Sequence, residues 1–213
     1  MLDVRSTLLI TVLLGVIARS TVGQSAALYR VVNGETDSDG FPTTPARVCI
    51  GSGGAEDCYT PPPRDPPFGL NAKTQDVKLA TGITLILFMA DSSAGGSGSL
   101  SIIALLENHD GHLQNLLPKV TVSEQSEYGI WNLPNISAMP ILVTADYVWA
   151  EGETHFAHHR YRISSYVYDK QAGRYAERDQ FVTVKKYPGL DDTDAIKVLE
   201  PEKAKIVTRL QRK

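Results

Sequence analysis

The stretch ILVTAD, from Ile141 to Asp146, nearly repeats an earlier stretch, ILFMAD, from Ile86 to Asp91. Four of the six letters agree, and the two stretches lie 55 residues apart. We interpret both as β-strands. Their agreement raises the hypothesis that the chain contains one structural unit twice, with chance similarity as the alternative.

The sequence after each stretch supports this hypothesis. A run of alternating apolar residues follows, then a turn that ends in glycine, then a short third run, at offsets of 61 and 62 residues. The drift in offset falls in loops, where insertions are tolerated. The first unit contains Leu100–Leu106, Gly111 and Val120–Val122, and the second contains Tyr161–Val167, Gly173 and Val182–Val184.

Alternating periodicity and glycine-ended turns are typical of antiparallel strands. We therefore predict an all-β fold with two tandem three-stranded meanders, at about 84–122 and 139–184, inside a β domain that spans 77–200. A lone three-stranded sheet has an apolar face that must be covered. Two such sheets can cover each other, so we expect a sandwich-like domain. Two units are too few for a closed propeller.

The last residues change period. Pro201 suits the first turn of a helix, and acidic Glu202 follows it. Ile206, Val207 and Leu210 form a narrow apolar stripe. We predict a short C-terminal helix over 201–213.

Residues 1–23 have the layout of a secretory signal peptide, with a short polar start, an apolar run and then small residues. The apolar run of 13 residues is shorter than the ~20 that span a bilayer, and an uncleaved anchor is the alternative. Cleavage would remove two positive charges and one negative charge, so the formal net charge of −3 would become −4. Such a chain has no broad attraction to nucleic acid.

Residues 24–76 are predicted to hold an N-terminal strand, a disulfide loop and a proline-rich strap. Cys49 and Cys58 flank a glycine-rich loop, CIGSGGAEDC, and export would place them in an oxidising compartment. We expect one disulfide between them, with a redox or metal pair as the alternative. Five prolines in Tyr59–Gly69 favour extended chain that covers the core.

Three histidines, His155, His158 and His159, are the candidate metal ligands, because imidazoles bind zinc and copper. In a helix they would share one face. In a strand, positions 158 and 159 point to opposite faces, and positions 155 and 159 lie ~13 Å apart. We expect a strand, which places the histidines on the surface of a hairpin, and keep the metal site as the alternative.

This hairpin is predicted to turn at Glu151–Glu153 and to project as an arm beyond the core. The turn would pair three residues of one strand with three of the next: Ala145 with His159, Asp146 with His158, and Trp149 with His155. Aromatic side chains beyond a core often form contact surfaces, since they bury large areas at low entropy cost. Tyr147, Trp149 and Phe156 are therefore the predicted binding residues. The alternative for Trp149 is packing under the strap or the terminal helix.

Several parts of the sequence resemble uncharacterised exported proteins of environmental bacteria. They are the N-terminal segment, CIGSGGAEDC (49–58), ILVTAD, HRYRISSYVYD (159–169) and VKKYPGLDD (184–192). That resemblance implies export and transfers no catalytic motif. We expect a secreted or periplasmic binding module without a cofactor, whose partner is a protein, a glycan or an envelope component rather than nucleic acid. A metal-dependent or hydrolytic enzyme that uses the histidines is the alternative.

Overall fold

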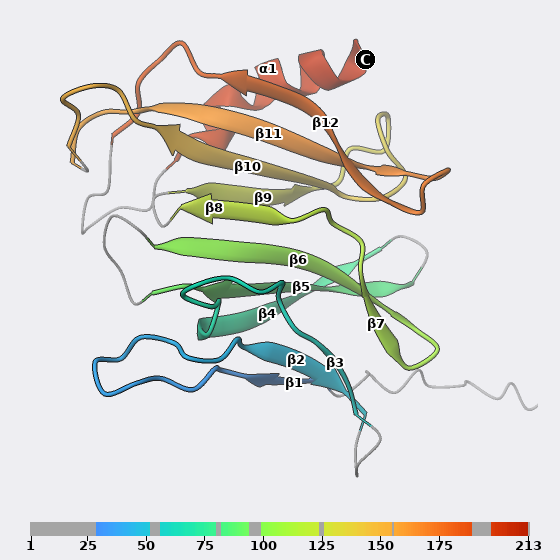
Figure 1. The fold of residues 1–213 in the computed structure, drawn as a ribbon. Coiled ribbons are helices and arrows are strands. Elements are labelled where there is room, and N and C mark those ends of the chain that lie inside the picture. Colours follow the sequence, from blue (N-terminus) through green and yellow to red (C-terminus); the bar gives the residue numbers. More distant parts are fainter. Residues whose placement is uncertain are drawn as a thin grey trace, which may run out of the picture.

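The computed structural model describes residues 29–51, 56–79, 82–93, 99–123, 126–154, 156–188 and 197–212. Within them the chain forms three antiparallel sheets and one helix, stacked in layers (Figure 1). The predicted all-β, sandwich-like fold with a C-terminal helix is confirmed. The predicted signal peptide lies outside the described residues.

The strands divide among the sheets as follows. The three-stranded sheet has the order β1-β2-β3 and contains β1 (Tyr29–Val32), β2 (Arg47–Ile50) and β3 (Asp57–Tyr59). The five-stranded sheet has the order β4-β5-β6-β7, with β8 also paired to β6, and contains β4 (Leu70–Lys78), β5 (Thr84–Asp91), β6 (Leu100–His109), β7 (His112–Asn115) and β8 (Val120–Ser123). The four-stranded sheet has the order β12-β11-β10-β9 and contains β9 (Glu127–Trp131), β10 (Ile141–Val148), β11 (Arg160–Asp169) and β12 (Arg174–Val182).

Both predicted meanders are present, but the third strand of the second unit is β12, which ends at Val182 and so shares only that residue with the predicted run Val182–Val184. The first unit runs through β5 and β6 and then a third strand that is broken into β7 and β8, and the second runs through β10, β11 and β12. Each unit also has a strand before it, β4 or β9, which pairs with the ILxxAD strand. The prediction placed Leu70–Asp76 in the N-terminal segment, before the β domain. The structure places them in β4, an edge strand with mostly exposed or half-buried side chains.

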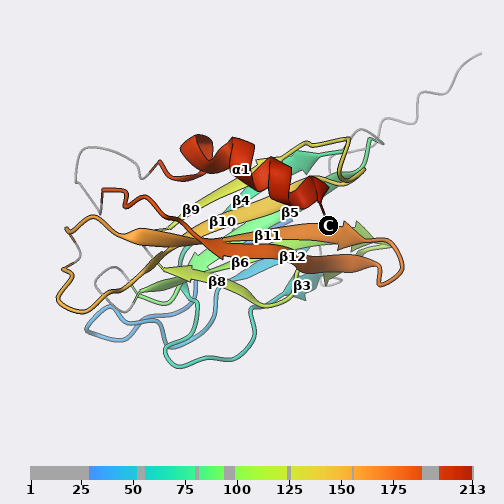
Figure 2. The ribbon, with the colours of Figure 1, turned by 90° about the horizontal axis from the view of Figure 1, so that it is seen from above.

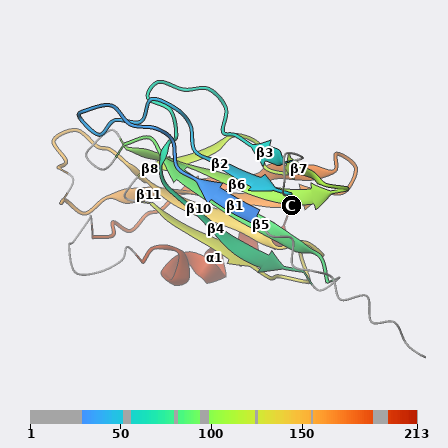
Figure 3. The ribbon, with the colours of Figure 1, turned by 90° about the horizontal axis from the view of Figure 1, so that it is seen from below.

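The strand β5 is buried on both faces. Leu85, Leu87 and Met89 pack into the inner cluster, which lies between the five-stranded and four-stranded sheets. Ile86 and Phe88 point the other way and pack against the three-stranded sheet. Figure 3 shows that small sheet lying over β5 and β6. A strand with cover on both sides has no polar face, which explains why ILFMAD reads as a continuous apolar run.

The strand β10 is covered in the same way. Leu142 packs into the inner cluster, whereas Ile141 and Val143 pack against the helix α1 (Leu199–Gln211). Figure 2 shows α1 lying across the outer face of the four-stranded sheet. The small sheet, the five-stranded sheet, the four-stranded sheet and α1 therefore form four stacked layers. The two ILxxAD strands, β5 and β10, lie in the two inner layers.

The helix α1 is held at both ends by side chains from the sheet. Its N-terminal backbone amides, from Val198 and Leu199, donate hydrogen bonds to the Glu127 carboxylate, at 2.8 Å for Leu199. Toward its C-terminus, Arg209 donates two hydrogen bonds to the buried carboxylate of Asp179, at 2.6 and 3.0 Å. The helix begins two residues before the predicted Pro201, because Glu127 provides the cap that the local sequence lacks.

The predicted disulfide is confirmed, since Cys49 and Cys58 are bonded and lie opposite each other on β2 and β3. A disulfide indicates an oxidising compartment, so the protein resides outside the cytoplasm. At the end of the proline-rich strap, Phe68 is fully buried against the small sheet and β5. Among the described residues, no helix has the length and apolar character that crossing a bilayer would require.

Replacing either of two neighbouring residues of β5 should destabilise the fold, because they are buried on opposite faces. We expect Leu87→Ala and Phe88→Ala each to lower the free energy of unfolding by about 2–5 kcal/mol. Urea unfolding of the purified variants measures this. The control is Ile83→Ala, where the half-exposed side chain precedes the strand. A Phe88→Ala variant as stable as the control would show that the small sheet does not cover β5.

Candidate functional site

The predicted binding residues lie where β10 ends and the chain returns to β11. Tyr147 is half-buried against the cluster beneath α1, whereas Trp149 is 44% exposed and Phe156 is 76% exposed. We call these three residues the aromatic tip. The loop between β10 and β11, which carries Trp149 and Phe156, extends from the sheet at the left of Figure 1.

Tyr147 and Trp149 form a packed group with His159. The Tyr147 and Trp149 ring centroids are 5.0 Å apart in an edge-to-face arrangement, and the Trp149 and His159 centroids are 5.1 Å apart. Such contacts contribute ~0.5–1.5 kcal/mol each beyond simple burial. Trp149 therefore packs on its neighbours in the loop, rather than under the strap or the helix as the alternative proposed. Phe156 stays out of this group, because its side chain is mostly in solvent.

Glu153 holds the loop in shape. Its carboxylate, which is 9% exposed, accepts hydrogen bonds from Lys186 at 2.6 Å, from Nδ1 of His159 at 2.9 Å and from the backbone N–H of Ala150 at 3.0 Å. The bond to Lys186, more than the bond to His159, lowers the pKa of Glu153 to about 2 from its ordinary value of 4.5. The local sequence indicates only a turn at Glu153, because its partner Lys186 is 33 residues away.

The predicted pairing of this hairpin is wrong by four residues. Ala145 lies opposite Ile163 and Asp146 opposite Arg162, so neither meets a histidine. A shift of four keeps every side chain on its predicted face, because strand side chains alternate with a period of two. The strands separate after Val148, and His159 instead pairs with Tyr187 in an isolated bridge. The loop therefore folds back on the following segment and does not continue as a two-stranded arm.

The histidines take different positions. His159 is fully buried, against the prediction that it lies on a hairpin surface, because it pairs with Tyr187 and packs against the rings of Tyr147 and Trp149. His158 is exposed, and His155 lies outside the described residues. The described part of 154–161 contains a turn and the start of β11, not the helix that would bring the three imidazoles together.

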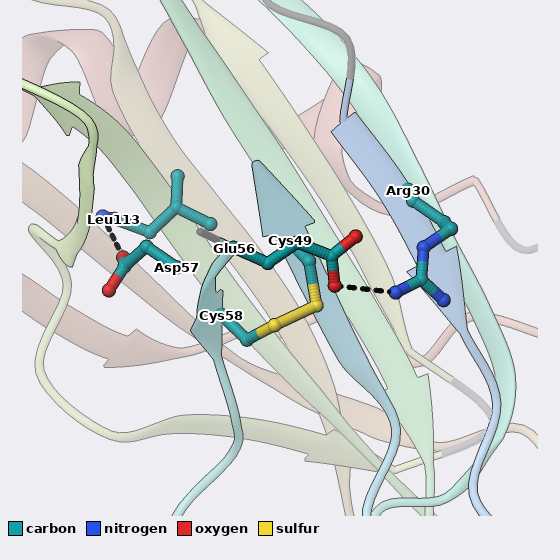
Figure 4. Close-up of a disulfide and its surroundings, with 6 residues drawn as sticks. All are labelled: Arg30, Cys49, Glu56, Asp57, Cys58 and Leu113. Carbon is teal, nitrogen blue, oxygen red and sulfur yellow. Dashed lines mark hydrogen bonds and ion pairs between the residues drawn. A yellow bond between two sulfur atoms is a disulfide. The ribbon is translucent and has the colours of Figure 1, made fainter. Parts of the chain in front are cut away.

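Among the described residues, one group has the composition and spacing of metal ligands: Cys49, Glu56 and Cys58. The two sulfur atoms are bonded to each other, so neither offers the thiolate that binds a metal. Figure 4 shows the Glu56 carboxylate directed to Arg30, with which it forms an ion pair at 2.7 Å. This group therefore serves as a covalent link in the small sheet.

Glu153 and His159 form a carboxylate–imidazole pair of the kind that orients a general base. A base of this kind needs a nucleophile within hydrogen-bond reach of its other nitrogen. Within the described part of the chain, Nε2 of the buried His159 has no hydrogen-bond partner. The surrounding rings of Tyr147 and Trp149 make the pair a packed support for the loop.

Among the described residues, two hollows of the surface lie away from the tip, and neither is lined by a predicted binding residue. The larger, of about 560 Å³, lies between the β11–β12 turn and the end of α1 and is lined in part by charges of both signs. The smaller, of about 220 Å³, lies between the two larger sheets and is mostly polar. The sequence did not reveal them, because each combines segments that are far apart in the chain.

Replacing Glu153 by Gln should make the free energy of unfolding less dependent on pH in the acidic range. The lowered pKa means that the Glu153 contribution is complete above pH ~4.5 and is lost as the pH falls toward about 2. We expect Glu153→Gln to be less stable than wild type near pH 6, with the difference shrinking below pH ~4. Urea unfolding across this pH range measures it.

The matched control is Glu151→Gln, two residues away on an exposed side chain. It should follow the wild-type pH profile throughout. An unchanged profile for Glu153→Gln would show that Glu153 does not hold the loop through its charge.

Comparison with known proteins supplies no further guide to the site. No known protein family matches the chain, and neither a curated protein nor a solved structure is significantly similar to it.

Proposed function

We propose that this protein is a secreted or periplasmic binding module that contacts its partner through the aromatic tip. The observation that carries this proposal is the exposure of two large rings, Trp149 and Phe156, on one loop. Exposed aromatic side chains on an ordered support are typical of binding hot spots, because little entropy is lost when they are covered. The partner is a protein, a glycan or an envelope component.

The support beneath the tip favours binding. Glu153 joins three separate points of the loop and its neighbour, and His159 is fully buried under the rings. The loop is thus fixed before a partner arrives, which lowers the cost of association. The alternative, a metal-dependent or hydrolytic enzyme, has less support, because His159 uses Nδ1 to bind Glu153 and is enclosed by aromatic rings.

A further exposed apolar side chain lies in the segment after β12. Val184 is 80% exposed, and its neighbour Thr183 donates a backbone hydrogen bond to the Tyr161 carbonyl. The segment after β12 therefore runs beside the start of β11, next to the loop that carries the tip.

Removing the tip should abolish partner capture without unfolding the protein. We expect Phe156→Ala to change the free energy of unfolding by less than about 0.5 kcal/mol, because the side chain is mostly in solvent. Trp149→Ala should cost about 1 kcal/mol through its ring contacts. Each immobilised variant is incubated with an envelope fraction of the host, and bound protein and polysaccharide are quantified.

The matched control is Phe41→Ala, a similarly exposed phenylalanine outside the tip. Components retained by wild type and by this control should be missing from both tip variants. Identical capture by all four proteins would contradict the proposal.

A further inference from the structure

A polar cleft of about 220 Å³ opens between the five-stranded and four-stranded sheets. It is lined by residues from β4, β5, β6, β8 and β9 and from the loops beside them: Asn71, Lys73, Met89, Asp91, Ser93, Ser99, Ser101, Ser123, Ser126 and Tyr128. None of these belongs to the aromatic tip. The inter-sheet interior is apolar along most of its length, so this end is chemically distinct.

One carboxylate in the cleft has a fixed orientation. Asp91 accepts a hydrogen bond from the Asn71 amide at 2.9 Å on one oxygen and from the Ser101 hydroxyl at 2.5 Å on the other. A carboxylate has about four acceptor positions. Two therefore remain for groups that donate hydrogen bonds, and their directions are set before a ligand arrives.

A β-bulge creates this arrangement. The register of β4 against β5 shifts between Leu70 and Lys73, and Asn71 adopts a positive φ of 50°. Bulges of this kind re-aim side chains and are common beside functional sites, and a positive φ outside glycine is often found there. Here the irregular backbone accompanies two features of the cleft: the Asn71 amide bonds to Asp91, and Lys73 is one of the lining residues.

The second ILxxAD stretch supports the same cleft. Its aspartate, Asp146, accepts hydrogen bonds from the backbone N–H and the hydroxyl of Ser123, which lines the cleft. In the first stretch, Asp91 accepts a hydrogen bond from the hydroxyl of Ser101. Each copy of the repeat thus ends in an aspartate that fixes one serine of the cleft.

The lining selects among ligand classes. A divalent cation would find one carboxylate, Asp91, and would be repelled by the ammonium group of Lys73. An anion would be repelled by the carboxylate of Asp91. A neutral ligand rich in hydroxyl groups suits the site, because it donates to Asp91 and to the serine oxygens and accepts from Lys73 and Asn71. Tyr128 and Met89 offer apolar surface for carbon atoms of a ring.

We propose that this cleft binds one ring of a neutral sugar, held by Asp91, Asn71 and Lys73. This site is separate from the aromatic tip, and the proposal goes beyond the binding function argued above.

The test uses the full chain and saturation-transfer NMR with glucose, galactose, mannose, N-acetylglucosamine and N-acetylgalactosamine, and with glucuronate as the anionic comparator. At least one neutral sugar should bind with a millimolar dissociation constant, and more tightly than glucuronate. Lys73→Ala and Asp91→Ala should each weaken this binding at least tenfold. Because Asp91 supports its neighbours, Lys73→Ala decides the result if Asp91→Ala does not fold.

The matched control is Lys78→Ala, an exposed lysine on the same strand that does not line the cleft. It should bind as wild type does, and so should Phe156→Ala, which separates this site from the tip. The proposal is overturned if no neutral sugar in the panel binds, if Lys73→Ala binds as tightly as Lys78→Ala, or if glucuronate is preferred. Capture of a partner by the tip does not depend on any of these outcomes.

Discussion

The fold depends on the need to cover two strands on both faces. In β5 and β10, successive side chains are buried, so each strand must lie between two layers. The two larger sheets cover each other on the inside. Outside, the small sheet with Phe68 covers β5, and α1 covers β10. The disulfide, the strap and the terminal helix therefore all serve the same requirement, which a two-sheet sandwich alone would leave unmet.

Because β5 and β10 are covered on both faces, the polar side chains of the candidate sites lie at the ends of these strands. Asp91 and Asp146 are the last residues of the two ILxxAD stretches. Asp91 accepts a hydrogen bond from the Ser101 hydroxyl, and Asp146 accepts one from the Ser123 hydroxyl. Just beyond β10, the buried pair of Glu153 and His159 carries the aromatic tip. The strand ends thus bear both candidate sites, a preformed apolar surface and a polar cleft, while the interior contributes stability.

Much of this fold could be predicted from the sequence, because the relevant signals are local. The repeated ILxxAD stretch, the glycine-ended turns and the Pro201 region locate the meanders and the helix. Periodicity fixes which face a side chain takes but not which partner it meets, so the pairing of Ala145 was displaced by four residues. The burial of His159 depends on Tyr187, and the cleft depends on a bulge in a polar edge strand. Neither has a local signal in the sequence.

Native-state hydrogen exchange of the backbone amides in β5 and β10 tests the central claim most directly. If both strands are enclosed between layers, their amides should exchange only through global unfolding, with the same dependence on denaturant as the whole protein. Exchange of either strand through a smaller opening, while the other stays protected, would contradict the claim. It would mean that one outer layer detaches and that only a two-sheet core holds the chain together.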